Sequence, residues 1–242
     1  MLLKDKVILV TGASKGIGAA ITRRCLEEGG SVVACYRTYS NLLSCLESQY
    51  VRERFFSICA DVTNNKDVAE MMQKIKSQFG HLDGIVNNAG VITRTYDWKD
   101  IPNDDWWSNY STNVVGPWNI IRQGSKLIFN EASIVNISSI YSAAPENEAL
   151  SYSISKAGLD ALTIALAKEL APNIRVNAIQ PGNTLTSMVP DENKKSQIEN
   201  KTLLKRSACP DEIAATVVFL LSDMSSYMTG SVIPVDGGYL IK

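Results

Sequence analysis

The chain has 242 residues, of which 45% are hydrophobic and 20% are charged, and its formal net charge at pH 7 is −1. This length and composition suit one globular α/β domain and exclude an intrinsically disordered chain. The balanced charge, with no basic stripe, argues against nucleic acid as the main partner. No apolar run reaches spanning length, and the first residues lead directly into an expected strand. We therefore expect no nucleic-acid partner, no membrane segment and no signal peptide.

Five cysteines are scattered through the chain, and no two of them form a C-x-x-C pair. An odd number of dispersed thiols is typical of a reduced, cytoplasmic protein. Cys35 and Cys59 lie in apolar, strand-like runs and are expected in the core. The single histidine, His81, cannot supply a zinc site of the usual kind, so we expect no metal.

The first motif is an apolar run at residues 7–11 that ends in a glycine-rich turn and continues as a helical pattern over residues 19–28. Glycines allow the backbone to approach a pyrophosphate closely and adopt positive φ at little cost. The helix N-terminus adds unpaired N–H groups and the positive end of its dipole. The G-x-x-x-G-x-G spacing predicts a dinucleotide phosphate site, although an ordinary strand-to-helix turn is the alternative. The expected phosphate loop contains Gly12, Ser14, Lys15, Gly16, Ile17 and Gly18.

Strand-like and helical segments alternate through the rest of the chain. After the first strand we expect further strands at residues 31–36, 54–60, 82–86, 133–139, 174–179 and 231–235. The longest expected helix covers about residues 103–129, and Pro117 must disturb it because proline lacks the N–H. This order predicts an α/β fold: a single, Rossmann-like, doubly wound parallel sheet of about seven strands with helices on both faces. One domain covers residues 1–242, with a substrate lid at 187–209.

Polar residues gather where the expected strands end, and ligands of such sheets bind at that edge. Ser139 ends the fifth strand, and Tyr152 and Lys156 follow it on one helix. Residues four apart share a helix face, so this phenol and this ammonium lie together. A nearby ammonium lowers the pKa of a phenol, which makes it a better acid–base catalyst. By itself such a pair is usually a solvated helix face.

Together these motifs resemble the single-domain branch of the short-chain dehydrogenase/reductase family, closest in pattern to its 3-oxoacyl-[acyl-carrier-protein] reductases. The resemblance covers nearly the whole chain and follows the family's order and spacing. It is carried by the residues Thr11 to Gly18, Asp61, Asn87 to Gly90, Asn113, Ser139, Tyr152, Lys156, Pro181, Gly182 and Asp236 to Gly238.

The resemblance implies hydride transfer between a nicotinamide cofactor and a carbonyl or secondary alcohol. It implies that Tyr152 is the general acid for reduction, or the base for oxidation, and that Ser139 orients the substrate oxygen. Lys156 would hold the ribose and lower the phenol pKa, and Asn113 would anchor a water in a proton relay. The alternative is a non-catalytic NADP(H)-binding sensor or partner subunit on the same fold.

The residues after the second strand bear on the choice of cofactor. Members that prefer NAD usually place an acidic residue at the end of this strand, where this chain has Tyr36 followed by Arg37. With Lys15 in the loop, two cations and no carboxylate favour a 2′-phosphate and hence NADP(H). If both are only surface charges, NAD(H) remains possible. Further cofactor contacts are expected at Asp61, Val62, Asn88, Ala89, Gly90, Tyr152, Lys156, Pro181, Gly182, Thr184 and Thr186.

The substrate stays open among a 3-oxoacyl thioester, a sugar-derived ketone, a steroid and a small secondary alcohol. Residues expected to touch it are Arg94, Tyr96, Trp98, Glu146, Asn147 and Met188. The segment from Leu204 to Ala208 departs from the Leu-Gly-Arg-x-Gly that the family often has there.

The resemblance also implies a homotetramer or homodimer, joined through the long helices and the C-terminal strand. Trp106, Trp107 and Trp118 lie on the longest expected helix. We expect them to be core residues or subunit contacts rather than a substrate platform.

Overall fold

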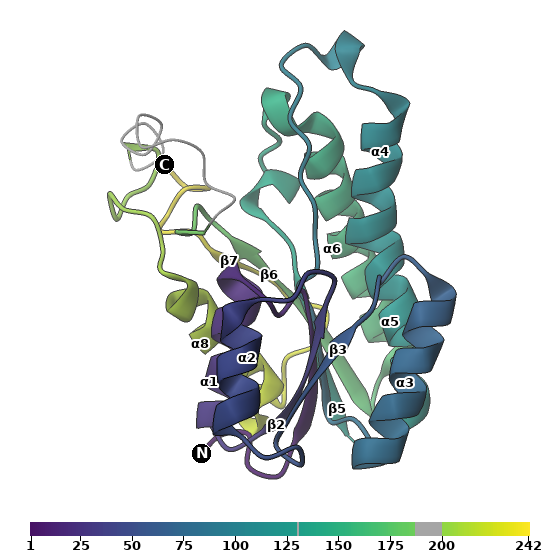
Figure 1. The fold of residues 1–242 in the computed structure, drawn as a ribbon. Coiled ribbons are helices and arrows are strands. Elements are labelled where there is room, and N and C mark those ends of the chain that lie inside the picture. Colours follow the sequence, from purple (N-terminus) through teal and green to yellow (C-terminus); the bar gives the residue numbers. More distant parts are fainter. Residues whose placement is uncertain (130, 187–199) are drawn as a thin grey trace.

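The computed structural model describes residues 1–129, 131–186 and 200–242. Over these residues its centre is a seven-stranded sheet in the order β3-β2-β1-β4-β5-β6-β7, with all neighbours parallel (Figure 1). This confirms the predicted sheet. The strands are β1 (Val7–Thr11), β2 (Ser31–Tyr36), β3 (Phe55–Cys59), β4 (Gly84–Asn87), β5 (Ala132–Ile137), β6 (Ile174–Pro181) and β7 (Val232–Val235).

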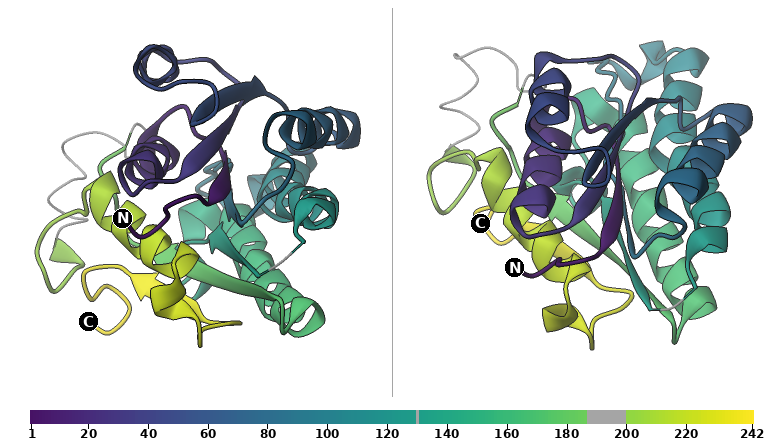
Figure 2. Two further views of the ribbon diagram at one scale, coloured as in Figure 1. Left: turned by 90° about the horizontal axis from the view of Figure 1, so that it is seen from below. Right: turned by 60° about the horizontal axis from the view of Figure 1, so that its bottom comes forward.

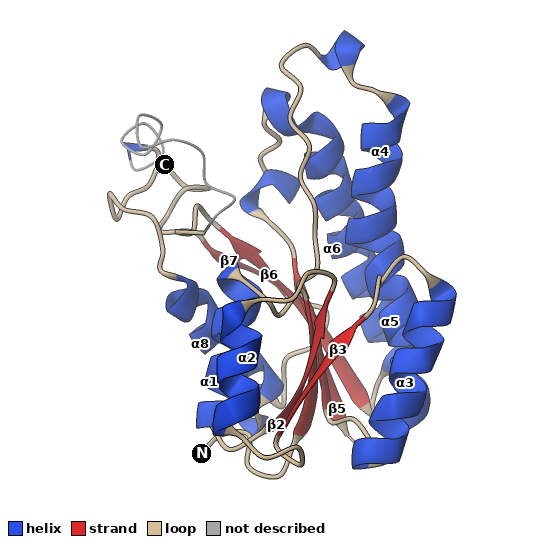
Figure 3. Ribbon diagram, in the orientation of Figure 1, coloured by secondary structure: helices blue, strands red, loops and turns tan. Residues whose placement is uncertain are grey.

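Helices cover both faces of the sheet, as predicted (Figure 2, Figure 3). On one face lie α1 (Gly16–Glu27), α2 (Asn41–Gln49) and α8 (Pro210–Leu221). On the other lie α3 (Asn65–Phe79), α4 (Asn103–Tyr110), α5 (Gly116–Gly124) and α6 (Leu150–Leu170). None of the helices in the described ranges has the length and apolarity needed to cross a membrane.

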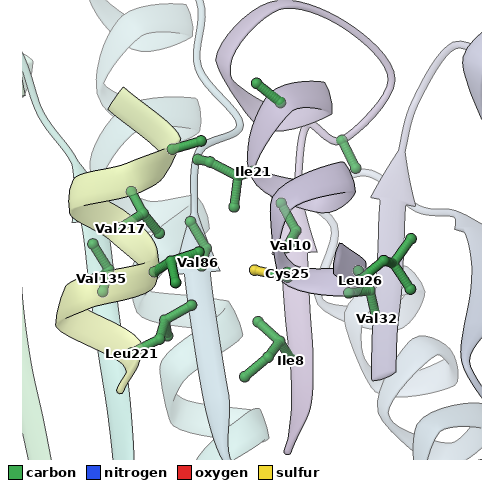
Figure 4. Close-up of a cluster of buried hydrophobic side chains, with 14 of the residues drawn as sticks. Ile8, Val10, Ile21, Cys25, Leu26, Val32, Val86, Val135, Val217 and Leu221 are labelled. Carbon is green, nitrogen blue, oxygen red and sulfur yellow. The ribbon is translucent and has the colours of Figure 1, made fainter. Parts of the chain in front are cut away.

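Two apolar layers attach these helices to the sheet. Successive strand residues point to opposite faces, so Ile8 and Val10 pack on the α1 and α8 side while Val7 and Leu9 pack on the α3 and α5 side. Figure 4 shows the first layer, in which side chains of α1 and α8 meet those of the central strands. Because β1 is buried on both faces, it is a continuous apolar run rather than an alternating one.

The longest expected helix is interrupted where proline predicts a disturbance. After α4 the chain forms a π-helical turn, Ser111–Val115, and then enters α5. Pro117 lies in the first turn of α5, the position where a missing N–H costs least. The turn carries Asn113 in its middle and so determines where this side chain points.

One expectation about burial was wrong, and a second keeps only one of its alternatives. Cys35 is buried, but Cys59 is exposed, because it is the last residue of β3 and β3 is an edge strand of the sheet. Trp107 and Trp118 have exposed fractions of 68% and 42%, so neither is a core residue. Their role as subunit contacts remains a prediction.

The departure from the family's Leu-Gly-Arg-x-Gly pattern has a structural counterpart. Lys205, at the place of the first glycine, has a φ of 55°, in the left-handed region that favours glycine. Here a lysine adopts that conformation, at a cost of roughly 1 kcal/mol. Of the predicted lid at 187–209, residues 187–199 lie outside the described residues, and Met188 is among them.

Candidate active site

A cavity of about 970 Å³ opens at the carboxyl ends of the strands, where the sequence predicts a composite site. Within the described residues, its wall contains every expected cofactor contact except Gly18. It also contains Ser139, Tyr152 and Lys156, whereas Asn113 lies behind it. The fold therefore brings together residues from opposite ends of the chain, as the family resemblance implies.

The glycine loop lies tightly against the segment that follows β4. Gly12 and Gly16 have φ angles of 64° and 57°, which glycine alone adopts readily. A Cβ built on Gly12 would lie 2.9 Å from the Cα of Ala89, and one on Gly18 would lie 2.2 Å from the carbonyl oxygen of Gly12. Neither position has room for a side chain, so the glycines set the shape of the loop.

Asn88 and Thr11 join the ends of β4 and β1. The Asn88 side-chain amide donates to the carbonyl oxygens of Thr11 at 3.0 Å and Gly12 at 3.1 Å. In return the Thr11 hydroxyl oxygen accepts from the backbone N–H groups of Asn88 and Ala89, both at 3.0 Å. Asn88 lines the cavity, but its side chain holds the phosphate loop in place.

The end of the cavity beside β2 and β3 carries opposite charges. Arg37 Nη1 lies 3.8 Å from Asp61 Oδ2, with exposed side-chain fractions of 68% and 35%. Burial opposes ionisation of Asp61, but hydrogen bonds from the Thr63 backbone and hydroxyl, with the charge of Arg37, lower its pKa below the usual range. A long, exposed ion pair contributes little to stability. Arg37 is therefore free to change partner.

The candidate catalytic residues that line the cavity lie around Tyr152, on α6. The Ser139 side chain is close enough to the Tyr152 phenol to act on the pKa of that group, and the Lys156 ammonium lies 5.7 Å from the centre of its ring. Lys156 Nζ donates to the carbonyl oxygen of Ile137 at 2.7 Å. The neighbouring Ser138 hydroxyl donates instead to the backbone of Lys156. Ser139 is thus the serine that lies beside the phenol, and its role toward a substrate stays a prediction.

Burial dominates the titration of this group. It raises the pKa of Tyr152 to about 12, against the opposing hydrogen bond from Ser139. It lowers the pKa of Lys156 to about 8, against the opposing charge of Asp160. The lowered phenol pKa expected from the Tyr-x-x-x-Lys spacing is therefore absent from this structure, because burial has the largest effect on the phenol. At neutral pH the phenol carries its proton.

Asn113 connects the segment after β4 to α6. Its amide donates to the Val91 carbonyl oxygen at 3.0 Å and to the Ser155 hydroxyl at 2.9 Å. Its Oδ1 accepts from the Val91 N–H at 3.0 Å. A Cβ on Gly90 would lie 3.2 Å from Asn113 Oδ1 and 3.6 Å from Lys156 Nζ. Asn113 therefore lies near the ammonium, and its place in a water relay stays a prediction.

The part of the cavity away from β2 and β3 contains some of the expected substrate residues and several that the sequence analysis did not predict. Arg94, Tyr96, Glu146 and Asn147 line it, whereas Trp98 is exposed and lies outside the wall formed by the described residues. The additional wall residues here include Tyr141, Glu148 and Lys201, and Ser40, which was also missed, follows Arg37 after β2. Glu148 could have been found from its proximity to two expected residues. Lys201 had no local signal, because only the fold brings it to Glu146.

The low pKa of Lys156 leads to a testable pH dependence of stability. A lysine whose pKa is 10.5 when unfolded and about 8 when folded destabilises the protein fully below pH 8. This penalty is lost as the pH rises through 10.5. In the absence of nucleotide, the free energy of unfolding of Lys156→Met, relative to that of wild type, should be higher at pH 7 than at pH 10. The difference between the two pH values should be about 2 to 3 kcal/mol.

Urea denaturation of both proteins across pH 7 to 10 measures this difference (roughly the window between the two pKa values). Lys168→Met, on the exposed side of α6, is the control and should show no such trend. A stability difference that stays constant with pH would contradict the lowered pKa.

Comparison with known proteins defines the class. Residues 12–240 match the family model described as enoyl-(acyl carrier protein) reductase. The chain is 35% identical over 248 residues to the 3-oxoacyl-[acyl-carrier-protein] reductase FabG of Thermotoga maritima, with 100% of both chains covered. It is 38% identical over 244 residues to L-xylulose reductase of Caenorhabditis elegans, covering 97% of this chain and 96% of the relative.

Solved structures agree. A short-chain dehydrogenase/reductase of Brucella melitensis, titled glucose/ribitol dehydrogenase, has a TM-score of 0.94 and 28% identity over 100% of this chain and 99% of its own. A blue fluorescent protein from a metagenomic library, solved with NADPH, has a TM-score of 0.93 and 29% identity over 99% of each chain. The fold and cavity are those of a nicotinamide-dependent oxidoreductase. The chain belongs to the short-chain dehydrogenase/reductase family.

Proposed function

We propose that this protein transfers a hydride between NADP(H) and a carbonyl or secondary alcohol, with Tyr152 as general acid or base. The observation that carries this proposal is the single cavity that contains the glycine loop at one part of its wall and Ser139, Tyr152 and Lys156 at another. A binding protein needs the loop but has no use for a serine placed beside the Tyr152 phenol.

Three features of the cavity fit an adenine dinucleotide with a 2′-phosphate. The close approach of Gly12 to Ala89 leaves space only for backbone there, which suits phosphate binding through N–H groups. Lys15 and Arg37 supply positive charge. The buried Ser40 hydroxyl oxygen lines the cavity and has no hydrogen-bond partner among the described residues. A 2′-phosphate would provide one.

The residues of the chain then have separate roles in the reaction. Bound NADPH supplies the hydride, and the protein positions the substrate and handles the proton. Ser139 donates a hydrogen bond to the substrate carbonyl oxygen. Tyr152 gives that oxygen its proton, which its pKa of about 12 makes available at neutral pH. Lys156 holds the ribose hydroxyls through its ammonium.

The cofactor preference is tested by titration with NADPH and NADH, following nicotinamide fluorescence. NADPH should bind more tightly, and Arg37→Ala should weaken it by about 10-fold or more while leaving NADH unchanged, because only the 2′-phosphate needs the guanidinium. Arg24→Ala, on the exposed surface of α1, is the control. Equal affinity for the two nucleotides would mean that Lys15 and Arg37 are surface charges only.

The relatives leave two main substrate classes, since their names specify a 3-oxoacyl thioester and a ketose.

We propose further that residues 1–242 form one domain carrying both the cofactor and the substrate site, with a lid at 187–209. The family resemblance supports a cytoplasmic homotetramer or homodimer. Sedimentation velocity of the purified protein would test its assembly.

A further inference from the structure

Charged side chains surround the part of the cavity that a substrate would reach. They come from three separate segments of the chain, before α4, before α6 and after residue 200. Arg94 Nη1 lies 2.6 Å from Glu148 Oε1, and Lys201 Nζ lies 2.8 Å from Glu146 Oε1. We define the substrate wall as Arg94, Tyr141, Glu146, Asn147, Glu148 and Lys201.

The charged members of this wall are balanced among the residues that the structure describes, and the apolar residues Val91, Ile92 and Ile140 line the cavity near them. Each of its cations is matched by a carboxylate, and the Tyr239 hydroxyl also donates to Glu146 Oε1 at 2.7 Å. The side chains of Arg94, Glu148 and Glu146 keep exposed fractions of only 27–28%. These partly buried charged groups therefore line the site without giving it a net charge.

The wall lies beside the reactive phenol. The rings of Tyr141 and Tyr152 meet edge to face with their centres 6.4 Å apart. The charge of Arg94 is near enough to act on both phenols, and Glu146 acts on Tyr141. A carbonyl held against Tyr152 therefore places its substituents among these charged groups.

We propose that the substrate of this protein is a neutral, polyhydroxylated ketone, of the ketose class, and that its product is the corresponding polyol. This rests on the function proposed above. The carbonyl carbon receives a hydride from bound NADPH and its oxygen receives a proton from Tyr152. The ketone is reduced to a secondary alcohol, NADPH is oxidised to NADP⁺, and solvent restores the proton of Tyr152.

A hydroxyl group suits this wall because it both donates and accepts. It can donate to the carboxylates of Glu146 and Glu148 and accept from Arg94 without breaking the charge balance. An alkyl chain placed against Arg94, Glu146 and Glu148 would remove water from paired charges and return no hydrogen bonds, and only the apolar part of the lining would suit it. A phosphate or carboxylate would face cations that already have partners, with two carboxylates beside them. These costs disfavour fatty acyl and anionic substrates.

The experiment compares ketones of matched size in the presence of NADPH. D- and L-xylulose are five-carbon 2-ketones with hydroxyl groups, and 2-pentanone is the five-carbon 2-ketone without them. Acetoacetyl-CoA represents the thioester class. We expect kcat/KM for at least one xylulose to exceed that for 2-pentanone and for the thioester by about 100-fold or more, because a site built for hydroxyl groups rejects an analogue that lacks them.

The Glu148→Gln variant tests the wall itself. It keeps the size of the side chain but removes the charge that holds Arg94. We expect it to lower kcat/KM for the ketose by about 10-fold or more and to leave the value for 2-pentanone within about 2-fold. Glu27→Gln, in an exposed ion pair on α1, is the matched control and should leave both unchanged.

The outcomes separate the two proposals. Faster reduction of the thioester or of 2-pentanone than of either ketose would overturn the ketose assignment and leave the reductase intact. Equal losses in Glu148→Gln for ketose and pentanone would also overturn it, because the wall would then be structural. If no ketone is reduced while NADPH binds, both the reductase and the ketose assignment fail.

Discussion

Tyr152→Phe should lower kcat for carbonyl reduction by about 10²- to 10⁴-fold, the usual contribution of a general acid. The variant keeps the ring, and therefore its edge contact with Tyr141, but removes the proton that the carbonyl oxygen must receive. The pKa of about 12 for this phenol means that wild-type protein carries the proton throughout the neutral range. Rates are measured from NADPH absorbance with a saturating ketone.

The binding of NADPH to Tyr152→Phe separates chemistry from folding. Its Kd, from nicotinamide fluorescence, should stay within about 3-fold of wild type, because the glycine loop, Arg37 and Lys156 would still hold the nucleotide. Tyr110→Phe, exposed on α4, is the control and should retain full activity. If Tyr152→Phe kept a tenth of the wild-type rate, another group would have to supply the proton.

Gly18→Ala should destabilise the protein by about 3 kcal/mol or more and abolish nucleotide binding. The new Cβ would lie 2.2 Å from the Gly12 carbonyl oxygen and 2.4 Å from Asn88 Nδ2. The first of these atoms is backbone and the second is held by two hydrogen bonds, so neither can move without opening the loop. Overpacking of a tight site typically costs 1–3 kcal/mol, and here the loss of the Asn88 contacts adds to it.

Urea denaturation measures the first effect and NADPH fluorescence the second. Gly158→Ala, on α6, is the matched control, since its Cβ would meet Val114 Cγ2 at an ordinary 3.4 Å. There the exchange should be neutral or should stabilise the helix by up to about 1 kcal/mol. Equal stabilities of the two variants would show that the loop around Gly18 can relax.

The sheet and the glycine loop could be predicted because their signals are local. A buried run, a glycine-rich turn and a helical pattern follow one another between Val7 and Glu27, so periodicity and glycine spacing suffice. The same holds for α3. The Asn64 side chain caps its N-terminus, and Gly80, with a φ of 81°, ends it. In these elements, local preference and tertiary structure agree.

The hydrogen bonds between Asn88 and Thr11 at the phosphate loop, and the substrate wall, could not be predicted in this way. The hydrogen bonds between Asn88 and Thr11 join residues 77 positions apart, and they exist because β1 and β4 are neighbours in the sheet. Lys201 meets Glu146 only after the chain has folded. The pKa of Tyr152 is likewise determined by burial, which four-residue spacing on a helix does not report.

The π-helical turn before α5 makes the site sensitive to chain length as well as to residue type. Such a turn accommodates one more residue than the α-helix around it would, while the helices before and after it keep their faces. Deleting one residue within Ser111–Val115 would convert the turn to an α-helical one and leave the faces of α4 and α5 in place. Asn113 would then lose its hydrogen bonds to Val91 and Ser155, because the turn itself determines where its side chain points. Natural variation in length should therefore be excluded from this turn, even though it lies outside the cavity's reactive group.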